Sequence, residues 1–161
     1  MGIRHLGDPL YTSWFGGITL GIHELGHLIF GPLGRWPGVA GGSFAQVAAP
    51  IAAAGILYRQ RDYFGITVAG AWLAFSLWSL ATYVGDARAQ ELPLLALTPD
   101  PIHDWNWMLG RLGLLNWDKS LAFLTRVVAF FVWLASILLG GWLVWTMARR
   151  PSSKFKVQGS K

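Results

Sequence analysis

The chain carries the motif His23-Glu24-Leu25-Gly26-His27 inside an apolar segment, WFGGITLGIHELGHLIFGPL at residues 14–33. On a helix, residues four positions apart lie on one face, one turn from each other, so the two His side chains point the same way. Two imidazoles in this arrangement hold a zinc ion and place Glu24 beside a water molecule. The alternative without a metal is a cluster of polar side chains that form their hydrogen bonds with neighbouring helices. A metal explains both the spacing and the ionisable groups, each of which would otherwise be unfavourable by about 2.5 kcal/mol or more at a bilayer centre.

The composition is that of a membrane protein. Hydrophobic residues make up 53% of the 161 residues, charged residues only 13%, and ten residues are Trp. The chain has no Cys, which excludes disulfides and thiolate metal sites. Basic and aromatic residues do not alternate as they do in nucleic-acid-binding proteins, so the net charge of +5 is attributed to topology and to anionic lipid headgroups.

The apolar pattern predicts an all-α integral membrane protein with about four transmembrane helices. Spans are predicted at 14–33, 43–58, 64–84 and 127–147. The second is short for a membrane that needs about 20 residues, and its many Ala residues favour packing against other helices. Residues 1–148 are predicted to form a single metalloprotease-like domain, and 149–161 a basic cytoplasmic tail.

Two connecting segments are more than simple loops. Residues 31–42 (GPLGRWPGVAGG) are rich in Gly and Pro, which predicts a non-helical turn or re-entrant loop. In the long segment 87–126, apolar residues recur with helical spacing at Trp105, Met108, Leu109 and Leu112. This pattern predicts an amphipathic helix at the membrane interface that begins at His103 or Asp104.

The distribution of Lys and Arg predicts the orientation. If all four segments span, the side with both termini and the turn at 59–63 carries eight basic against two acidic residues. The other side carries five of each. The excess of positive charge predicts that both termini are cytoplasmic and that the metal motif opens to the outer side.

A zinc ion with two His ligands needs a third protein ligand and an open position for water. Asp104, His103 and Asp86 are the candidates, because all three lie on the side that faces the opening of the site, whereas His5 lies on the opposite side. Asp104 could instead be an N-cap, and Asp86 a solvated residue at a helix end. Gln46, near the start of the second span, is either a hydrogen-bond donor between helices or a group that orients substrate or water.

The combined pattern resembles the site-2-protease family of intramembrane zinc metalloproteases. The matching features are His23-Glu24-Leu25-Gly26-His27 in the first span, a Gly/Pro loop and an Ala-rich second helix, over roughly residues 14–58, followed by a downstream Asp. The resemblance implies that His23, His27 and a later Asp bind one Zn²⁺ and that Glu24 activates water. The family's second motif has Asp followed by Gly; here Asp104 is the nearest equivalent, with Asp86 behind it.

These features lead to a leading hypothesis and two alternatives. The first is a membrane-embedded zinc metallopeptidase that hydrolyses a peptide or membrane-protein substrate within or near the bilayer, with Glu24 as general base. The main alternative is a non-proteolytic membrane subunit with a structural or degenerate metal site, in a homo-oligomer or larger complex. A third is a metal-dependent hydrolase of a lipid or small amphiphile. No nucleic-acid partner is expected.

Overall fold

A computed structural model describes residues 15–92 and 102–149 of the chain. Every regular element within these ranges is helical, which confirms the all-α class. The elements are α2 (Gly16–Phe30), the 3-10 turn η1 (Gly31–Leu33), α3 (Arg35–Arg59), α4 (Tyr63–Gly85), α5 (Asp104–Leu112), the 3-10 turn η2 (Leu115–Trp117) and α6 (Asp118–Ala148). Most of the predicted basic tail and both chain termini fall outside the described ranges, so the predicted orientation stays a prediction.

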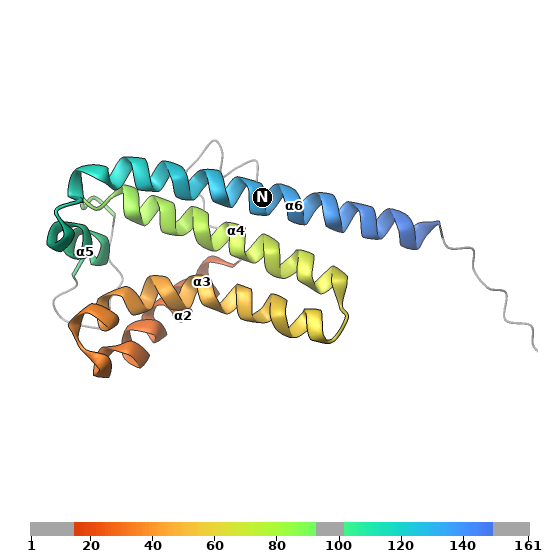
Figure 1. The fold of residues 1–161 in the computed structure, drawn as a ribbon, viewed down its shortest axis with the longest axis horizontal. Helices are drawn as coiled ribbons and strands as arrows, with labels where there is room; N and C mark the ends of the chain where they lie inside the picture. Colours follow the sequence, from red (N-terminus) through yellow and green to blue (C-terminus); the bar gives the residue numbers. More distant parts are fainter. Residues whose placement is uncertain (1–14, 93–101, 150–161) are drawn as a thin grey trace, which may run out of the picture.

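Within residues 15–92 and 102–149, three helices are long and apolar enough to cross a membrane. They are α3, α4 and the continuous segment Leu115–Ala148 that contains α6. They run alongside one another, with α2 packed on the first half of α3 and α5 at one end (Figure 1). The first predicted span corresponds to α2, which has 15 residues and so a length of about 22 Å, shorter than the roughly 30 Å of a hydrocarbon core.

The contact between α4 and α6 forms the main core. Ala74, Phe75 and Trp78 of α4 pack against Ala129 of α6, and all four side chains are buried. The two small Ala residues allow the helix backbones to approach closely. At the end near α5, Arg88 binds the fully buried carboxylate of Asp118 with two hydrogen bonds of 2.7 and 2.9 Å, which fixes the start of α6 to the end of α4.

The prediction that residues 31–42 form a non-helical loop is wrong. Only η1 and Gly34 separate α2 from α3, which begins at Arg35 and has 25 residues, so the second span is not short. Pro37 is tolerated because it lies in the first turn, where a backbone N–H has no partner within the helix. The glycines serve the packing instead, since a Cβ at Gly41 would come within 2.7 Å of the Gly26 carbonyl oxygen of α2.

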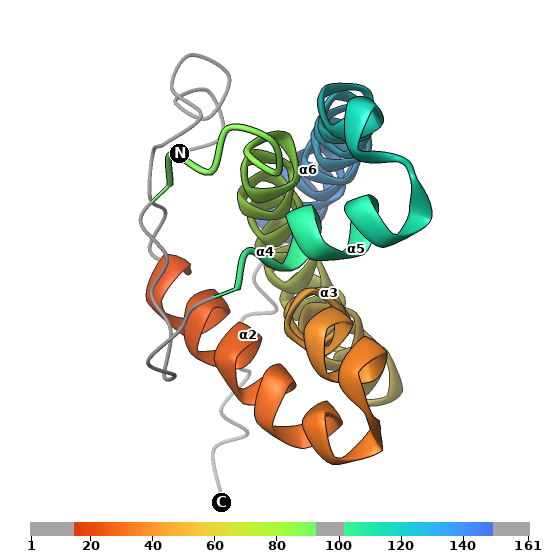
Figure 2. The ribbon, with the colours of Figure 1, turned by 90° about the vertical axis from the view of Figure 1, so that its left-hand side faces the viewer.

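The amphipathic helix predicted in the long connecting segment corresponds to α5. His103 is its N-cap, and the His103 ring accepts a hydrogen bond of 3.2 Å from the Asn106 N–H. The helix ends at Gly113, whose φ of 69° lies in the left-handed region that glycine adopts without strain. In the view along the bundle, α5 lies across the end of the long helices (Figure 2). The last helix starts earlier than the predicted span 127–147, because α6 begins at Asp118.

Candidate metal centre

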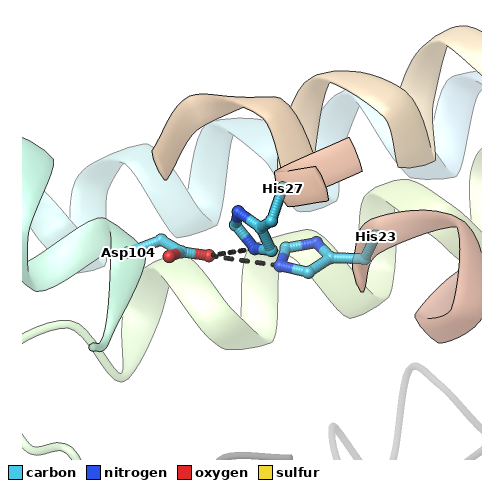
Figure 3. A group of neighbouring side chains, drawn as sticks. All are labelled: His23, His27 and Asp104. Carbon is cyan, nitrogen blue, oxygen red and sulfur yellow. Dashed lines mark hydrogen bonds and ion pairs between the residues drawn. The ribbon is translucent and has the colours of Figure 1, made fainter. Parts of the chain in front are cut away.

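Three predicted site residues meet at the end of the bundle near α5. His23 and His27 project from α2, with ring centroids 4.7 Å apart, and Asp104 comes from the first turn of α5 (Figure 3). The Oδ2 atom of Asp104 lies 3.1 Å from His23 Nε2 and 3.2 Å from His27 Nε2. One possible ligand atom from each residue thus lies within 4.8 Å of the other two.

These separations fit a tetrahedral zinc ion. With Zn–N and Zn–O bonds of about 2.0–2.1 Å, two ligand atoms of a tetrahedron lie roughly 3.3 Å apart. The observed distances from Asp104 Oδ2 to the two nitrogens, 3.1 and 3.2 Å, are close to this value, and the donor atoms of all three residues lie within 4.8 Å of one another. Two imidazoles and one carboxylate form a donor set that zinc accepts.

The hydrogen bond of His27 shows which ring nitrogen carries the proton. Its Nδ1 lies 2.8 Å from the carbonyl oxygen of Gly38 in α3. A carbonyl oxygen only accepts, so Nδ1 must donate its N–H, and in the neutral ring Nε2 then carries a lone pair. Gly38 therefore orients the ring so that this lone pair points at Asp104.

His23 is held in the same tautomer by Gln46. The His23 Nδ1 atom lies 2.9 Å from Gln46 Oε1, and the Gln46 amide nitrogen donates a hydrogen bond of 2.9 Å to the Ser76 carbonyl. Since the Ser76 carbonyl oxygen can only accept, the Gln46 amide nitrogen must face it, and Oε1 is left as the acceptor for His23 Nδ1–H. Partners of this kind set the tautomer and basicity of metal-binding imidazoles. Gln46 is thus a buried hydrogen-bond partner of His23.

The result is a group of acceptors that face one another. The Nε2 atoms of both rings and one Asp104 oxygen converge within hydrogen-bond distance, and in the neutral rings both Nε2 atoms are acceptors. A positive charge is required, because buried acceptors without a partner are unfavourable. A proton on one ring supplies such a charge but leaves the other neutral ring facing the carboxylate as an acceptor, and protons on both rings would place two like charges side by side in a mostly buried site. A single divalent cation satisfies all three donors at once.

Gly42 of α3 leaves the space for such an ion. A Cβ at this position would lie 2.6 Å from His23 Nε2 and would also overlap His27 Nε2. Any side chain at position 42 would therefore occupy the region between the two nitrogens. The absence of a side chain makes Gly42 part of the site, although sequence reasoning had assigned it only to the Gly/Pro segment.

The three side chains of the site differ in how deeply they are buried. The side chains of His23 and Asp104 are each 8% exposed, whereas that of His27 is 26% exposed. Glu24 is half-buried and directly follows His23. Among the described residues Glu24 forms no hydrogen bond or ion pair, so no neighbouring side chain engages its carboxylate. Access for water and substrate is expected on the His27 side.

Three hydrogen bonds hold α5 in place, so that Asp104 reaches the two rings. The Tyr83 hydroxyl accepts from the Asp104 N–H at 3.1 Å, and Asn106 donates to the Ala87 carbonyl at 2.8 Å. Trp105 Nε1–H donates to Ser43 Oγ at 3.1 Å and ties α5 to α3. The third candidate ligand is thus supplied by a short helix fixed to both α3 and α4.

The other two candidate ligands lie outside this group. His103 Nδ1 is occupied as the N-cap acceptor of α5, and its Nε2 faces Asp86 Oδ2 at 3.4 Å. Asp86 also accepts backbone hydrogen bonds from Glu91 and Leu92. His103 and Asp86 therefore form a separate buried pair that supports the start of α5.

The environment shifts two pKa values in α5 and its cap. Burial would raise the pKa of Asp104, but the His23 and His27 rings at hydrogen-bond distance from its carboxylate outweigh this effect and hold the pKa below its ordinary value. Burial lowers the pKa of His103, although the nearby Asp86 carboxylate acts in the opposite direction. At neutral pH Asp104 is therefore a carboxylate, the form that binds metal, and His103 is neutral.

Comparison with known proteins adds no assignment to this geometry. No protein-family model, curated protein or solved structure matches the chain. The candidate function therefore depends on the residues and contacts described above.

Proposed function

We propose that this protein is a membrane-embedded zinc metallopeptidase whose metal ligands are His23, His27 and Asp104. The observation that supports this most strongly is the convergence of two imidazole nitrogens, each fixed as an acceptor by a partner at Nδ1, on one carboxylate oxygen. The three apolar helices of spanning length support a location in the membrane. The proposal agrees with the resemblance to the site-2-protease family seen in the sequence.

The roles of the residues follow from their chemistry. When bound, zinc supplies a Lewis acid that lowers the pKa of water toward about 7. Glu24 accepts a proton from the attacking water and delivers it to the leaving amine. Gly38 and Gln46 keep the two rings in the tautomer that presents Nε2. The partly apolar surroundings limit the access of bulk water.

An open ligand position favours catalysis over a structural metal. A structural zinc site is normally closed by four protein ligands. Within the described part of the chain only three suitable donors meet, and His103 is engaged elsewhere. The 26% exposure of the His27 side chain leaves a path to the fourth position.

The test is Glu24→Gln in protein reconstituted in lipid nanodiscs. Zinc should bind with unchanged affinity, while cleavage of a transmembrane peptide library, followed by mass spectrometry, should fall by about 10²-fold or more. Glu91→Gln is the matched control, because Glu91 has an exposed side chain outside the site. Equal cleavage by both variants would remove Glu24 as the base, and zinc-dependent release of fatty acid in place of peptides would indicate a lipid hydrolase.

A further inference from the structure

Two arginines and two tryptophans gather where α3 begins and α5 ends. The guanidinium carbons of Arg35 and Arg111 lie 5.2 and 5.4 Å from the centre of the Trp107 ring. Trp36 packs edge-on against the same ring, with centroids 5.1 Å apart. These four residues, Arg35, Trp36, Trp107 and Arg111, are called the Arg–Trp cluster below.

The charge of the cluster is not balanced by the protein. Both guanidinium groups are exposed, and neither forms an ion pair with a carboxylate among residues 15–92 and 102–149. Arg35 also lies in the first turn of α3, where a cation opposes the helix macrodipole and no acidic residue is present. Both guanidinium groups lie within 5.4 Å of the centre of one ring, so they form one positively charged surface that suits an anion.

The position of the cluster identifies the anion that is available there. Helix α5 lies across the end of the long helices (Figure 2). Because helices that span a bilayer end at its headgroups, we infer that α5 and the Arg–Trp cluster lie at that level. Large apolar side chains in α5 and in the following η2 turn are exposed, including Leu112 and Trp117. Exposed apolar and Trp side chains beside Arg are typical of helices that lie in the membrane interface.

We propose that the Arg–Trp cluster binds the phosphate of an anionic phospholipid, and that this lipid strengthens metal binding by holding α5 against α3. The coupling rests on the proposed metal centre. Guanidinium groups bind phosphate oxygens through paired hydrogen bonds, and a phosphate bound by both arginines relieves their mutual repulsion. A zwitterionic lipid fits less well, because its choline cation would lie near the same two arginines.

The link to the metal runs through short stretches of helix. Arg35 precedes Gly38, whose carbonyl holds the His27 ring, by three residues of α3. Arg111 follows Asp104, the third ligand, by two turns of α5. A phosphate that bridges the arginines therefore draws together the two helices that complete the site. Coupling of this kind is reciprocal, and typical values change affinity 5- to 150-fold.

The experiment measures zinc affinity by chelator competition in two kinds of nanodisc, phosphatidylcholine alone and phosphatidylcholine mixed with phosphatidylglycerol. The wild type is expected to bind zinc about 5-fold or more tightly in the anionic discs. The double variant Arg35→Gln/Arg111→Gln should lose this gain. Arg149→Gln should keep it, because Arg149 also stacks on a Trp, Trp145, but lies at the opposite end of α6 (Figure 1).

A second readout detects the lipid directly. Native mass spectrometry should find phosphatidylglycerol retained by the wild type and by Arg149→Gln but not by the double variant. An equal gain in all three proteins would show that the anionic surface merely concentrates zinc, and would overturn the proposal. A gain produced by a soluble acidic peptide instead of the lipid would overturn it in favour of a substrate site. If zinc bound in neither kind of disc, the metal centre and the coupling would both be rejected. Retention of phosphatidylglycerol would then test the lipid site by itself.

Discussion

The substitution Gly42→Ala tests the space reserved for the metal. The new Cβ would lie 2.6 Å from His23 Nε2, whereas real Cβ atoms essentially never lie closer than 3.0 Å to another heavy atom. The ring must therefore move by at least about 0.4 Å, which exceeds the roughly 0.2 Å that metal–ligand distances tolerate. The methyl group also occupies the region between the two Nε2 atoms. We expect zinc affinity to fall by at least about 100-fold, equivalent to about 2.7 kcal/mol.

The assay is a competition titration with a zinc chelator in nanodiscs, with the absorption spectrum of the cobalt-substituted protein as a second readout. Gly55→Ala is the matched control, because Gly55 lies in the same helix and a Cβ added there would meet nothing within 4 Å. Both changes raise helix propensity by the same amount, up to about 1 kcal/mol, so they differ only at the site. Zinc binding by Gly42→Ala at the affinity of Gly55→Ala would refute the proposed position of the ion.

Three further predictions concern the partners of the ligands. Gln46→Leu should weaken zinc binding by about 10- to 100-fold, while Gln46→Glu, which keeps an acceptor for His23, should retain it in the same titration. Asp104→Asn should lose stoichiometric zinc and His103→Asn should keep it, as measured by inductively coupled plasma mass spectrometry. Because burial lowers the pKa of His103 in the folded state, the unfolded chain takes up a proton first below about pH 6.5. Thermal unfolding of chelator-treated protein should therefore show a smaller loss of stability in acid for His103→Asn than for the wild type.

The long apolar helices and the pair of His residues could be predicted from the sequence because both depend on local spacing. The Gly/Pro segment could not be assigned from composition. Pro37 lies where a helix does not need its N–H, and Gly41 packs against α2, so residues that usually interrupt a helix are compatible with its first turns. This distinction depends on the neighbouring helix, which local sequence does not show.

The third member of the candidate site also could not be identified from the local sequence. The sequence placed Asp104 and His103 ahead of Asp86 but could not choose among them, because the start of α5 decides which side chain turns inward. His103 is the cap and turns back to the Asn106 N–H, so Asp104 faces the rings. The contribution of Gly42 to the site could not be predicted from the sequence. Gly42 matters because it has no side chain where the rings of His23 and His27, from another helix, come close to α3.

All of the proposed chemistry depends on one divalent cation between His23, His27 and Asp104. X-ray absorption of the zinc-loaded protein, purified and checked for metal content, observes that ion and its neighbours. We predict one zinc per chain, with imidazole scattering from two His and nitrogen and oxygen neighbours at about 2.0–2.2 Å. A protein that retains no stoichiometric zinc, or a spectrum without imidazole scattering, would contradict the proposed centre.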